Sequence, residues 1–240
     1  MKRKHTENVR SKLSEPVSIV AHQLKNPIAV LKGYLEVLLS EDFGTLNPKQ
    51  REYINDAVSN VTRMIRIVTD LLDVAKIEAK RYELKPQRTD IVAITRNIIE
   101  GLSLWVRAFN SEIIFYPPLH IPLVFADPIK IHQVIENLIS NAVKYKSSGR
   151  GRVEIHIKPE GSSMVFRCKD NGIGIPRKDF PKVFLKFYRS EDALDIDPTG
   201  TGLGLYISKA IIEMSGGKIW FGKNRGKGMT FYFTLPIIKK

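Results

Sequence analysis

The stretches that decide the fold of this chain are Asp170-Asn171-Gly172-Ile173-Gly174-Ile175-Pro176 and Gly200-Thr201-Gly202-Leu203-Gly204-Leu205. The first follows a strand-like run, and the second opens a helix-like run. Glycines at this spacing allow the backbone to approach a ligand closely and allow N–H groups to face phosphate. Asp170 adds a carboxylate, and the helix-like segment 137–145 upstream contains two asparagines. Together these features indicate a nucleotide pocket that uses a carboxylate and metal-binding amides.

Two other kinds of phosphate-binding loop fit the sequence less well. A Walker loop reads G-x-x-x-x-G-K-[ST] between a strand and a helix. The nearest match, residues 217–224, lacks the Ser or Thr that would hold magnesium, and residues 219–221 within it read as a strand. The dinucleotide fingerprint is also incomplete, because Gly200, Gly202 and Gly204 are not followed by the further glycine that it requires.

The composition is that of a globular protein with one or two domains. The chain has 240 residues, of which 43% are hydrophobic, and no apolar run reaches the roughly 18 residues of a membrane-spanning helix. The basic start is followed by polar residues, so we expect no secretory signal. The single Cys168 excludes an internal disulfide and fits a reducing cytoplasm, and its phase in a strand predicts a buried structural thiol.

The net charge of +13 raises the question of nucleic-acid binding. Basic residues are spread along the chain, with mild clusters at 2–12 and 223–227. The sequence shows no basic platform interleaved with aromatic residues, the kind that stacks bases. We therefore predict no nucleic-acid partner, since a surface that attracts ATP, an acidic protein or the nearby membrane explains the charge equally well.

Residues 1–82 are predicted to form a helical hairpin, because their apolar residues recur with the 3.5-residue period of a coiled-coil or bundle seam. The seam positions are Val17, Val20, Leu24, Pro27, Leu31, Tyr34 and Leu38 in the first helix, and Ile54, Val58, Val61, Ile65, Val68, Leu72 and Ala75 in the second. Gly44 is expected to end the first helix, and Asn47-Pro48 to cap and open the second. Two helices bury little alone, so we expect a homodimer whose four-helix bundle covers the seam.

A linker over 83–89 and an α/β domain over 90–240 are expected to follow, since the composition shifts at 85–88 and the pattern then alternates between helix and strand. The predicted helices are 93–109, 128–146 and 201–215, and the predicted strands are 112–116, 123–126, 152–158, 163–169, 218–221 and 229–235. The predicted fold class is therefore α + α/β, a two-helix dimerisation hairpin followed by an α/β sandwich with helices on one face of a mixed sheet.

His22 on the first helix falls outside the apolar seam and is expected to face solvent. A surface histidine by itself is usually inert, but Asn26 lies one turn away on the same side. Pro27 removes a backbone hydrogen bond and can bend the helix. An exposed imidazole beside a kink is well placed to meet a large partner.

Five motifs in this order resemble the transmitter portion of the two-component sensor histidine kinases, and the resemblance covers nearly the whole chain. The similar segments are 21–28 for the H box, 127–133 with 137–145 for the N box, 169–176 for the G1 box, 184–189 for the F box and 200–205 for the G2 box. The resemblance implies a phosphoacceptor hairpin that dimerises, followed by a Bergerat-type ATP-binding domain with ATP and Mg²⁺ as cofactors.

The resemblance also implies roles for the matching positions. His22 would be the phosphoacceptor, with Gln23 and Asn26 beside it in the same motif. Asn137 and Asn141 would supply oxygens to Mg²⁺, which is a hard cation. The nucleotide would be held by Lys144 at a phosphate, Tyr145 beside the nucleotide, Asp170 at the adenine amino group, Arg189 at a phosphate or the lid, and Gly172, Gly174, Gly200, Gly202 and Gly204 around the pocket and the hinges of a lid over 177–199.

Gln23 departs from the family pattern, in which Glu or Asp usually follows the phosphorylated histidine. Glutamine cannot take a proton at working pH, so autophosphorylation is expected to be slower or to use water as the proton carrier. Loss of a general base typically costs ~10²–10⁴-fold in rate. Asn26 occupies the position that the family links with phosphatase activity, and the acidic member of that motif is again Gln23.

The function implied by the resemblance is autophosphorylation of His22 from ATP, followed by transfer to an aspartate of a response regulator receiver domain. The implied location is the cytoplasm, or the inner face of the membrane as part of a longer receptor. A catalytically weak dimeric scaffold that binds nucleotide and regulator is the alternative that Gln23 supports. An ATPase of the gyrase or chaperone sort fits less well, because of the heptad hairpin with its exposed His22.

Overall fold

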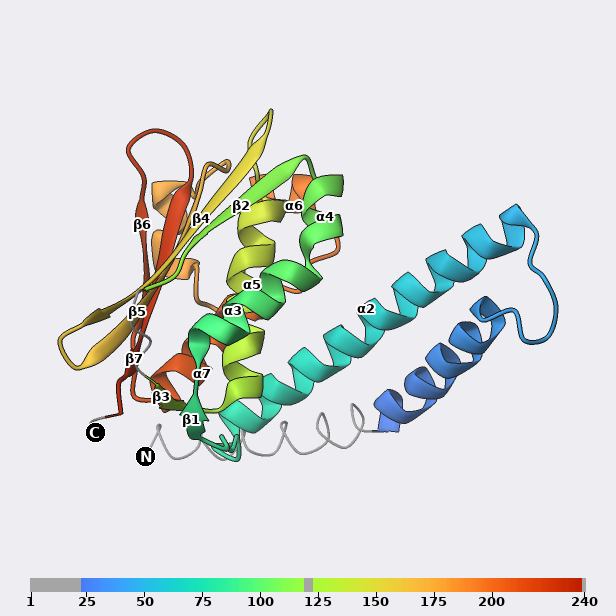
Figure 1. Cartoon of the computed structure of the whole chain (residues 1–240), viewed down its shortest axis with the longest axis horizontal. Coiled ribbons are helices and arrows are strands. Elements are labelled where there is room, and N and C mark those ends of the chain that lie inside the picture. The colour runs from blue at the N-terminus through green and yellow to red at the C-terminus, as the bar shows by residue number, and fades with distance from the viewer. Residues whose placement is uncertain (1–22, 119–122, 239–240) are drawn as a thin grey trace, which may run out of the picture. The chain divides into compact units, whose positions relative to one another are not determined.

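The computed structural model describes residues 23–118 and 123–238. The chain divides into two compact units, Met1–Tyr82 and Glu83–Lys240. The first is a helical hairpin and the second a sheet with helices (Figure 1). The predictions for Val17, Val20 and His22 fall outside the described residues.

Residues 23–78 of the first unit form two helices joined by a tight connection. Residues 23–39 are helical, and α2 spans Pro48–Glu78. Asn47 caps α2 as predicted, because its side chain accepts a hydrogen bond from the Gln50 N–H at 2.9 Å while the Gln50 side chain accepts one from the Asn47 N–H at 3.0 Å. This reciprocal capping box, with Pro48 at the first helical position, fixes where α2 begins.

Gly44 does not end the first helix, so that prediction is wrong. The helix ends at residue 39, and Glu41 then adopts a φ of 62°. The Glu41 carboxylate forms an ion pair with Arg51 and accepts a hydrogen bond from the Leu46 N–H at 3.2 Å, which anchors a non-glycine residue in the left-handed region. Gly44 lies later in the turn with a φ of 125°, and its N–H donates to the Glu41 carbonyl at 3.1 Å.

The predicted seam of the first helix is exposed in the single chain. Leu24, Leu31, Tyr34 and Leu38 keep 47%, 50%, 67% and 43% of their surface accessible. Four large apolar side chains along one stripe are the pattern of a surface that another molecule covers.

No helix within residues 23–118 and 123–238 combines the length and the apolar character that crossing a membrane requires.

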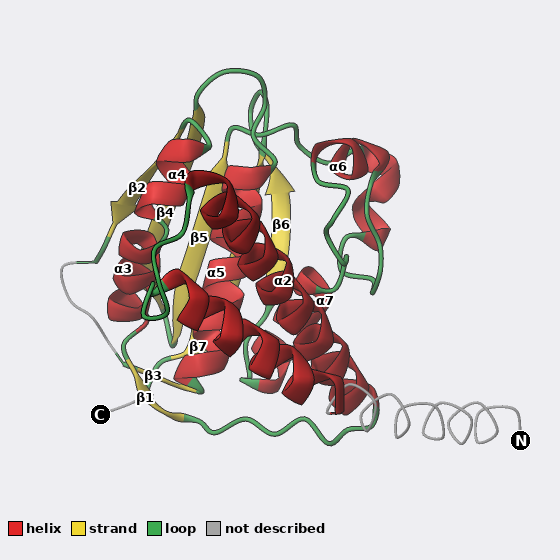
Figure 2. Cartoon of the chain, turned by 90° about the vertical axis from the view of Figure 1, so that its right-hand side faces the viewer, coloured by secondary structure: helices red, strands yellow, loops and turns green. Residues whose placement is uncertain are grey.

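The second unit contains a mixed sheet with helices on one face. Its five strands pair in the order β2-β4-β5-β7-β6, with β2 and β4 parallel and the other neighbours antiparallel. The strands are β2 (Ser111–Tyr116), β4 (Gly151–Glu160), β5 (Ser163–Asp170), β6 (Ile219–Lys223) and β7 (Met229–Pro236). The helices α3 (Ile91–Gly101), α5 (Pro128–Lys144) and α7 (Gly204–Met214) lie on one side of the sheet (Figures 1 and 2). The predicted helical hairpin followed by an α/β sandwich with a mixed sheet is confirmed.

A short strand lies inside the stretch 83–89 that the sequence suggested as a linker. This strand, β1 (Gln87–Thr89), pairs antiparallel with β3 (Val124–Ala126). Just before it, the Lys85 N–H donates to the Asp127 carboxylate at 2.9 Å. Both contacts attach the stretch to the second unit, and neither could be seen locally because the partners are far apart in the chain.

Two predicted helices have different bounds in the structure. The predicted helix 93–109 is two helices, α3 and α4 (Ser103–Ala108), separated at Leu102. The predicted helix 201–215 begins at Gly204 instead, because Gly202 adopts a φ of 69° that no helix accommodates.

The core of the second unit lies between the sheet and α5. Ile135 of α5 and the inward rings of Phe166 and Phe233 are fully buried, and the two rings stack with centroids 4.7 Å apart. Burial of each such side chain contributes about 1.5–3 kcal/mol, so this layer holds the helices in place. Cys168 lies in the same layer at 1% exposure, and burial raises the pKa of its thiol. The prediction of a buried structural thiol is confirmed.

Candidate functional site

Asn137 and Asn141 lie one turn apart on α5 and are held in fixed orientations. The Asn137 side-chain N–H donates to the Ser208 hydroxyl of α7 at 3.0 Å, and the Asn141 side-chain N–H donates to Oδ1 of Asn137 at 3.3 Å. Ser208 is buried, so the first bond is shielded from water. These bonds leave Oδ1 of Asn141 without a hydrogen-bond partner among the described residues. The pair therefore fits a hard cation, which prefers oxygen ligands.

Gly204, the first residue of α7, is required by the close approach of that helix to α5. A Cβ atom at this position would lie 2.3 Å from Oδ1 of Asn137. A side chain here would displace either the helix or the amide. Glycine thus lets the start of α7 meet the asparagine pair.

Lys144 at the end of α5 is paired with Asp197, a residue that the sequence analysis did not single out. Its Nζ lies 2.9 Å from Oδ2 of Asp197, and the two side chains are 21% and 11% exposed. Thr199 donates to the other carboxylate oxygen from its hydroxyl at 2.5 Å and from its N–H at 3.0 Å. Burial by itself raises the pKa of Asp197, but the hydrogen bonds from Thr199 and Lys144 and the Lys144 charge hold this pKa well below the usual range.

The loop after β5 is joined to the end of α5 through backbone contacts. The Ile173 N–H donates to the Tyr145 carbonyl at 3.0 Å. A Cβ at Gly172 would lie 2.3 Å from that same carbonyl oxygen, and Gly174 adopts a φ of 80°. These two glycines are therefore needed for a close approach and for a left-handed turn.

Asp170 ends β5 and uses one carboxylate oxygen to organise the loops around it. Its Oδ1 accepts hydrogen bonds from the Gly172 N–H at 2.8 Å and the Met229 N–H at 3.1 Å. No described residue donates to Oδ2. Burial raises the pKa of Asp170, although the N–H donors lower it and partly offset the effect. The free oxygen can accept a hydrogen bond from a ligand.

Two further residues support Asp170, and neither was predicted as a site residue from the sequence. The Asn224 side chain donates to the Asp170 carbonyl at 2.7 Å. A Cβ at Gly228 would lie 2.1 Å from the same oxygen. The turn between β6 and β7 therefore packs directly against the backbone of Asp170, a long-range contact with no local signal.

The segment predicted as the lid lies between β5 and α7 and contains a short 3₁₀ helix η1 (Arg177–Lys182) and a short helix α6 (Glu191–Ile196). Arg189 lies at its centre and donates to three backbone carbonyls, those of Gly200 at 3.0 Å, Ala193 at 2.7 Å and Asp197. The Arg189 side chain is thus a lid contact in this structure, one of the two roles expected for it.

Two glycines allow distant parts of this segment to approach each other closely. A Cβ at Gly200 would lie 3.1 Å from the Arg189 guanidinium carbon. A Cβ at Gly202 would lie 2.8 Å from the Phe187 carbonyl carbon, and Gly202 also has a φ of 69°. Phe187 has a φ of 62°, a left-handed conformation that is unfavourable for phenylalanine. Its side chain is 59% exposed, so burial of the ring does not compensate for this backbone strain. Its N–H donates to the Gly202 carbonyl at 3.0 Å, which holds this conformation.

Gln23 and Asn26 lie on the first helix of the other unit and are both exposed. His22, which directly precedes Gln23, lies outside the described residues. The contacts among the residues predicted to bind nucleotide therefore all lie within the second unit.

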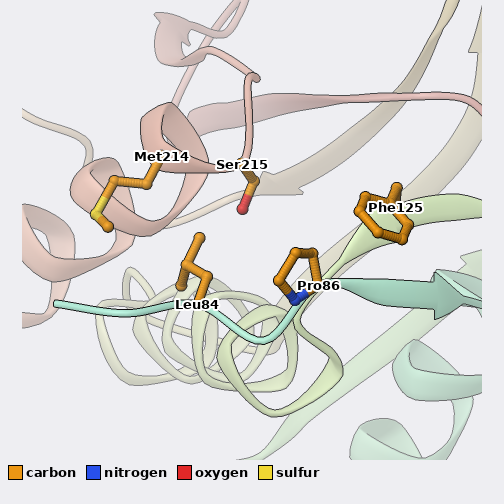
Figure 3. A pocket seen from close by; sticks show the side chains of 5 residues that line it. All are labelled: Leu84, Pro86, Phe125, Met214 and Ser215. Atoms are coloured by element: carbon orange, nitrogen blue, oxygen red, sulfur yellow. The ribbon is translucent and has the colours of Figure 1, made fainter.

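A hollow elsewhere in the second unit is apolar and contains none of the predicted site residues. Figure 3 shows its lining side chains, which are Leu84, Pro86, Phe125, Met214 and Ser215. None of these five side chains carries an acidic or basic group. Across the described parts of the chain, no cluster of three or more His, Cys, Asp or Glu side chains could hold a metal ion.

Two family models match the chain. Residues 126–239 match the histidine kinase-, DNA gyrase B- and HSP90-like ATPase family, and residues 12–80 match the His Kinase A (phospho-acceptor) domain. The first match contains the asparagine pair, the Asp170 loop and the lid.

Relatives with curated descriptions align over almost the whole chain. The sensor histidine kinase WalK of Bacillus subtilis (strain 168) is 36% identical over 232 residues, which are 96% of this chain and 38% of that protein. The sensor protein kinase WalK of Staphylococcus aureus is 34% identical over 232 residues, 96% of this chain and 55% of that protein. The chain thus spans less than two thirds of the length of these relatives, which are longer sensor kinases.

Solved structures agree with these matches. Full-length ShkA in complex with AMPPNP superposes on 94% of this chain and 46% of its own, with a TM-score of 0.75 and 25% identity. The catalytic domain of the histidine kinase ThkA, in a nucleotide-free form, covers 64% of this chain and 98% of its own, with a TM-score of 0.56 and 27% identity.

Proposed function

Because the chain belongs to the sensor histidine kinase family, whose phosphoacceptor and ATPase models it matches in order, we propose that it transfers the γ-phosphoryl group of ATP to His22. The phosphohistidine then passes the group to an aspartate of a response regulator receiver domain. The ATPase family implies ATP binding. The observation that carries the proposal is Asp170, with one oxygen bound to two backbone N–H groups and the other free.

Asp170 is the residue proposed to select the nucleotide base. The amino group of adenine is a donor, and Oδ2 of Asp170 is an acceptor held still by its neighbouring oxygen. A guanine base presents a carbonyl oxygen at the same ring position, which would face the carboxylate with no proton between them. The pocket therefore favours adenine by hydrogen-bond matching.

The asparagine pair is proposed to hold Mg²⁺. Oδ1 of Asn141 is available, and Asn137 is oriented by the buried Ser208. When bound, the metal ion supplies charge neutralisation at the phosphate oxygens. The amides contribute no charge, so the positive charge near the phosphates comes from the metal ion and from basic side chains such as Lys144.

Phosphoryl transfer requires positioning more than covalent chemistry from the protein. A nitrogen of the His22 imidazole attacks the γ-phosphorus, the bond to the bridging oxygen of ATP breaks, and ADP leaves. The imidazole proton must then go to a base. Gln23 can orient the ring through its side-chain oxygen but cannot accept that proton, so water is the proposed acceptor.

The helical hairpin is proposed to form a homodimer with the apolar stripe of the first helix inside a four-helix bundle. Leu31, Tyr34 and Leu38 are exposed in the single chain and supply that surface. Asn26, exposed on the same helix, is in turn proposed to orient water for dephosphorylation of the regulator. These activities are proposed for the whole sensor, which in the relatives is longer than this chain.

Incubation of the chain with γ-labelled ATP and Mg²⁺ tests the proposal. We expect label on the protein that is lost in acid and kept in base, the behaviour of a phosphoramidate. His22→Gln should remove the label and leave nucleotide binding within about twofold, since the nucleotide residues lie in the other unit. Nucleotide binding without any labelling of the unsubstituted chain would instead favour the alternative that Gln23 supports, a catalytically weak scaffold.

A further inference from the structure

One row of side chains crosses all five strands of the sheet on the face opposite α3, α5 and α7. The strand register places Tyr116 beside His156, His156 beside Arg167, Arg167 beside Tyr232, and Tyr232 beside Trp220. These five residues, here called the cross-sheet row, come from β2, β4, β5, β7 and β6. The helices α3, α5 and α7 lie on the other side of the sheet (Figure 1).

The aromatic rings of the cross-sheet row stand upright in two stacked pairs. The ring centroids of Tyr116 and His156 are 4.3 Å apart with an interplanar angle of 11°, and those of Trp220 and Tyr232 are 5.2 Å apart with an angle of 5°. Both separations are close to the spacing of adjacent strands, about 4.8 Å. The rings therefore stack along the direction from strand to strand and turn their edges toward solvent. Ring edges carry the positive end of the quadrupole and attract anions.

Arg167 lies between the two stacked pairs and carries a charge that nothing described neutralises. No described residue forms a hydrogen bond or ion pair with its side chain, and its Nε is buried. A buried donor without an acceptor is destabilising, and a bound acceptor would relieve this cost. The guanidinium offers a planar set of donors that matches a carboxylate.

The acidic residues on this face of β2 and β4 already have cationic partners. Glu154 lies 3.0 Å from both Arg152 and Lys169. Glu112 lies 2.8 Å from Arg150, and Glu160 pairs with Lys158. Burial lowers the pKa of His156, with the Arg167 charge acting in the same direction, so the imidazole is neutral at pH 7. Arg167 is thus the cation of this row that has no anionic partner among the described residues, and a carboxylate of another molecule could pair with it.

The two ends of the cross-sheet row are apolar and open. Tyr116 and Trp220 are 44% and 41% exposed, although each has one ring face covered by its stacked neighbour. A large aromatic surface on either side of a central cation is the arrangement of an interaction hot spot, in which aromatic and arginine side chains dominate.

We propose that the cross-sheet row is a docking surface for an acidic protein segment. A carboxylate of that segment binds the Arg167 guanidinium, and apolar neighbours of the carboxylate cover Tyr116 and Trp220. Charge complementarity supports this occupant, because the chain has a net charge of +13. A nucleic acid fits less well, since bases stack on ring faces and these inner faces are occupied by neighbouring rings. The surface contains none of the nucleotide-site residues, so it does not depend on the proposed kinase activity.

Binding of a labelled peptide to the full chain tests this proposal. The probe is a short fluorescent peptide of alternating Glu and Leu, compared with a peptide in which Gln replaces each Glu. We expect the acidic peptide to bind and Arg167→Gln to weaken it about tenfold, the range of one charge-assisted hydrogen-bonded pair. Lys158→Gln is the matched control on the same face, because it removes the same charge from an exposed residue, and it should change binding less than about twofold.

The fluorescence of Trp220 gives a second measurement of peptide binding, and this measurement does not require the Arg167→Gln variant to fold. The chain has two tryptophans, Trp105 and Trp220, so Trp105→Phe leaves Trp220 as the sole indole. Addition of the acidic peptide should shift its emission, and Trp220→Thr should weaken peptide binding. The proposal is overturned if the acidic peptide does not bind, or if Arg167→Gln and Lys158→Gln weaken it equally. It is also overturned if an oligothymidylate or vesicles of phosphatidylglycerol bind more tightly than the peptide in an Arg167-dependent way.

Discussion

The Lys144 ammonium and the Asp197 carboxylate lie 2.9 Å apart and join the end of α5 to the lid. Lys144 is the side chain proposed to meet a phosphate of ATP. In this structure its charge is already neutralised by Asp197, a residue of the segment predicted as the lid. We therefore predict that a phosphate group displaces Asp197 when it contacts Lys144, so that nucleotide binding moves this segment.

Asp197→Asn should consequently raise the affinity for ATP. The substitution removes the competing charge and keeps the shape of the side chain, so we expect a gain of about threefold to tenfold, the scale of one partly exposed ion pair. Affinity for adenosine, which has no phosphate, should stay the same. Titration calorimetry with both ligands measures the difference. Asp195→Asn serves as the control, because it removes the same charge from an exposed position on α6. An equal effect of the two variants would show that only the overall charge of the lid matters.

Asp170→Asn should weaken adenine nucleotide binding by about tenfold to a hundredfold, the effect of losing a charge-assisted hydrogen bond. The asparagine oxygen can still accept from the Gly172 and Met229 N–H groups, so the loops should keep their positions. The new NH₂ group would face the adenine amino group, and two donors repel. Unchanged affinity for ATP would remove Asp170 from the base-recognition role.

The same variant should change stability with pH in a defined direction. Because burial raises the pKa of Asp170 above its ordinary value, the folded protein holds this proton more tightly than the unfolded chain. The carboxyl group therefore loses stabilising free energy as pH rises from the ordinary Asp pKa through the raised one. Thermal unfolding of both proteins from about pH 3 to pH 7 should show Asp170→Asn gaining relative stability as pH rises across that window. A constant difference would contradict the raised pKa.

Asn141→Ala should lower nucleotide affinity in Mg²⁺ by roughly tenfold or more and leave binding in EDTA unchanged. The reason is that Oδ1 of Asn141 is the amide oxygen left free by the hydrogen bonds of the pair. Asn141→Asp keeps an oxygen at the same place and should restore the Mg²⁺ dependence. If Asn141→Ala weakens binding equally with and without Mg²⁺, the residue supports the fold of the pocket and is not a metal ligand.

Gln23→Glu should speed autophosphorylation, by up to about 10²-fold if proton removal limits the rate. Glutamate is nearly the same size as glutamine, and Gln23 is exposed, so the helix should not change. The added carboxylate can accept the imidazole proton, while its repulsion of the γ-phosphate is screened at an exposed site. Single-turnover phosphorylation at saturating ATP, from about pH 6 to pH 9, measures the effect across the titration of histidine. An equal rate at every pH would mean that Gln23 has no bearing on proton transfer.

The full chain should sediment as a dimer at micromolar concentration, and Leu31→Glu should make it monomeric. Leu31 is 50% exposed in the single chain and belongs to the apolar stripe of the first helix. A charge buried in a bundle seam is costly, whereas Lys25→Glu on the exposed surface of the same helix should leave the dimer intact. Monomeric unsubstituted protein would contradict the four-helix bundle.

Most features with a local signal were predicted correctly from the sequence, although Gly44 as the end of the first helix and residue 201 as the start of α7 were not. The cap of α2 by Asn47 needs only residues within one turn, and it was predicted from Asn47-Pro48, whereas the reciprocal bond to Gln50 was not. The glycines of the two loops and the strands of the sheet also follow from spacing and alternation. These elements were enough to indicate the hairpin and the sandwich.

Features that depend on contacts across the chain were not predicted. Asp197 contacts Lys144, and Asn224 contacts Asp170, although the partners are 53 and 54 residues apart in the sequence. β1 becomes a strand because β3 pairs with it. The cross-sheet row could not be predicted for the same reason. Its aromatic and basic residues come from five separate strands and form no cluster in the sequence.

The pairing of β5 directly with β7 has a consequence for how this chain can vary. Lys169 lies opposite Thr230, and no strand of the five-stranded sheet is drawn from the lid between them. The register of the sheet therefore sets no limit on the length of the lid. Since the entropy of closing a loop grows only slowly with its length, residues can be inserted into or deleted from the lid with little effect on the core. The segment predicted as the lid can therefore change in length without altering the strand order or register of the sheet.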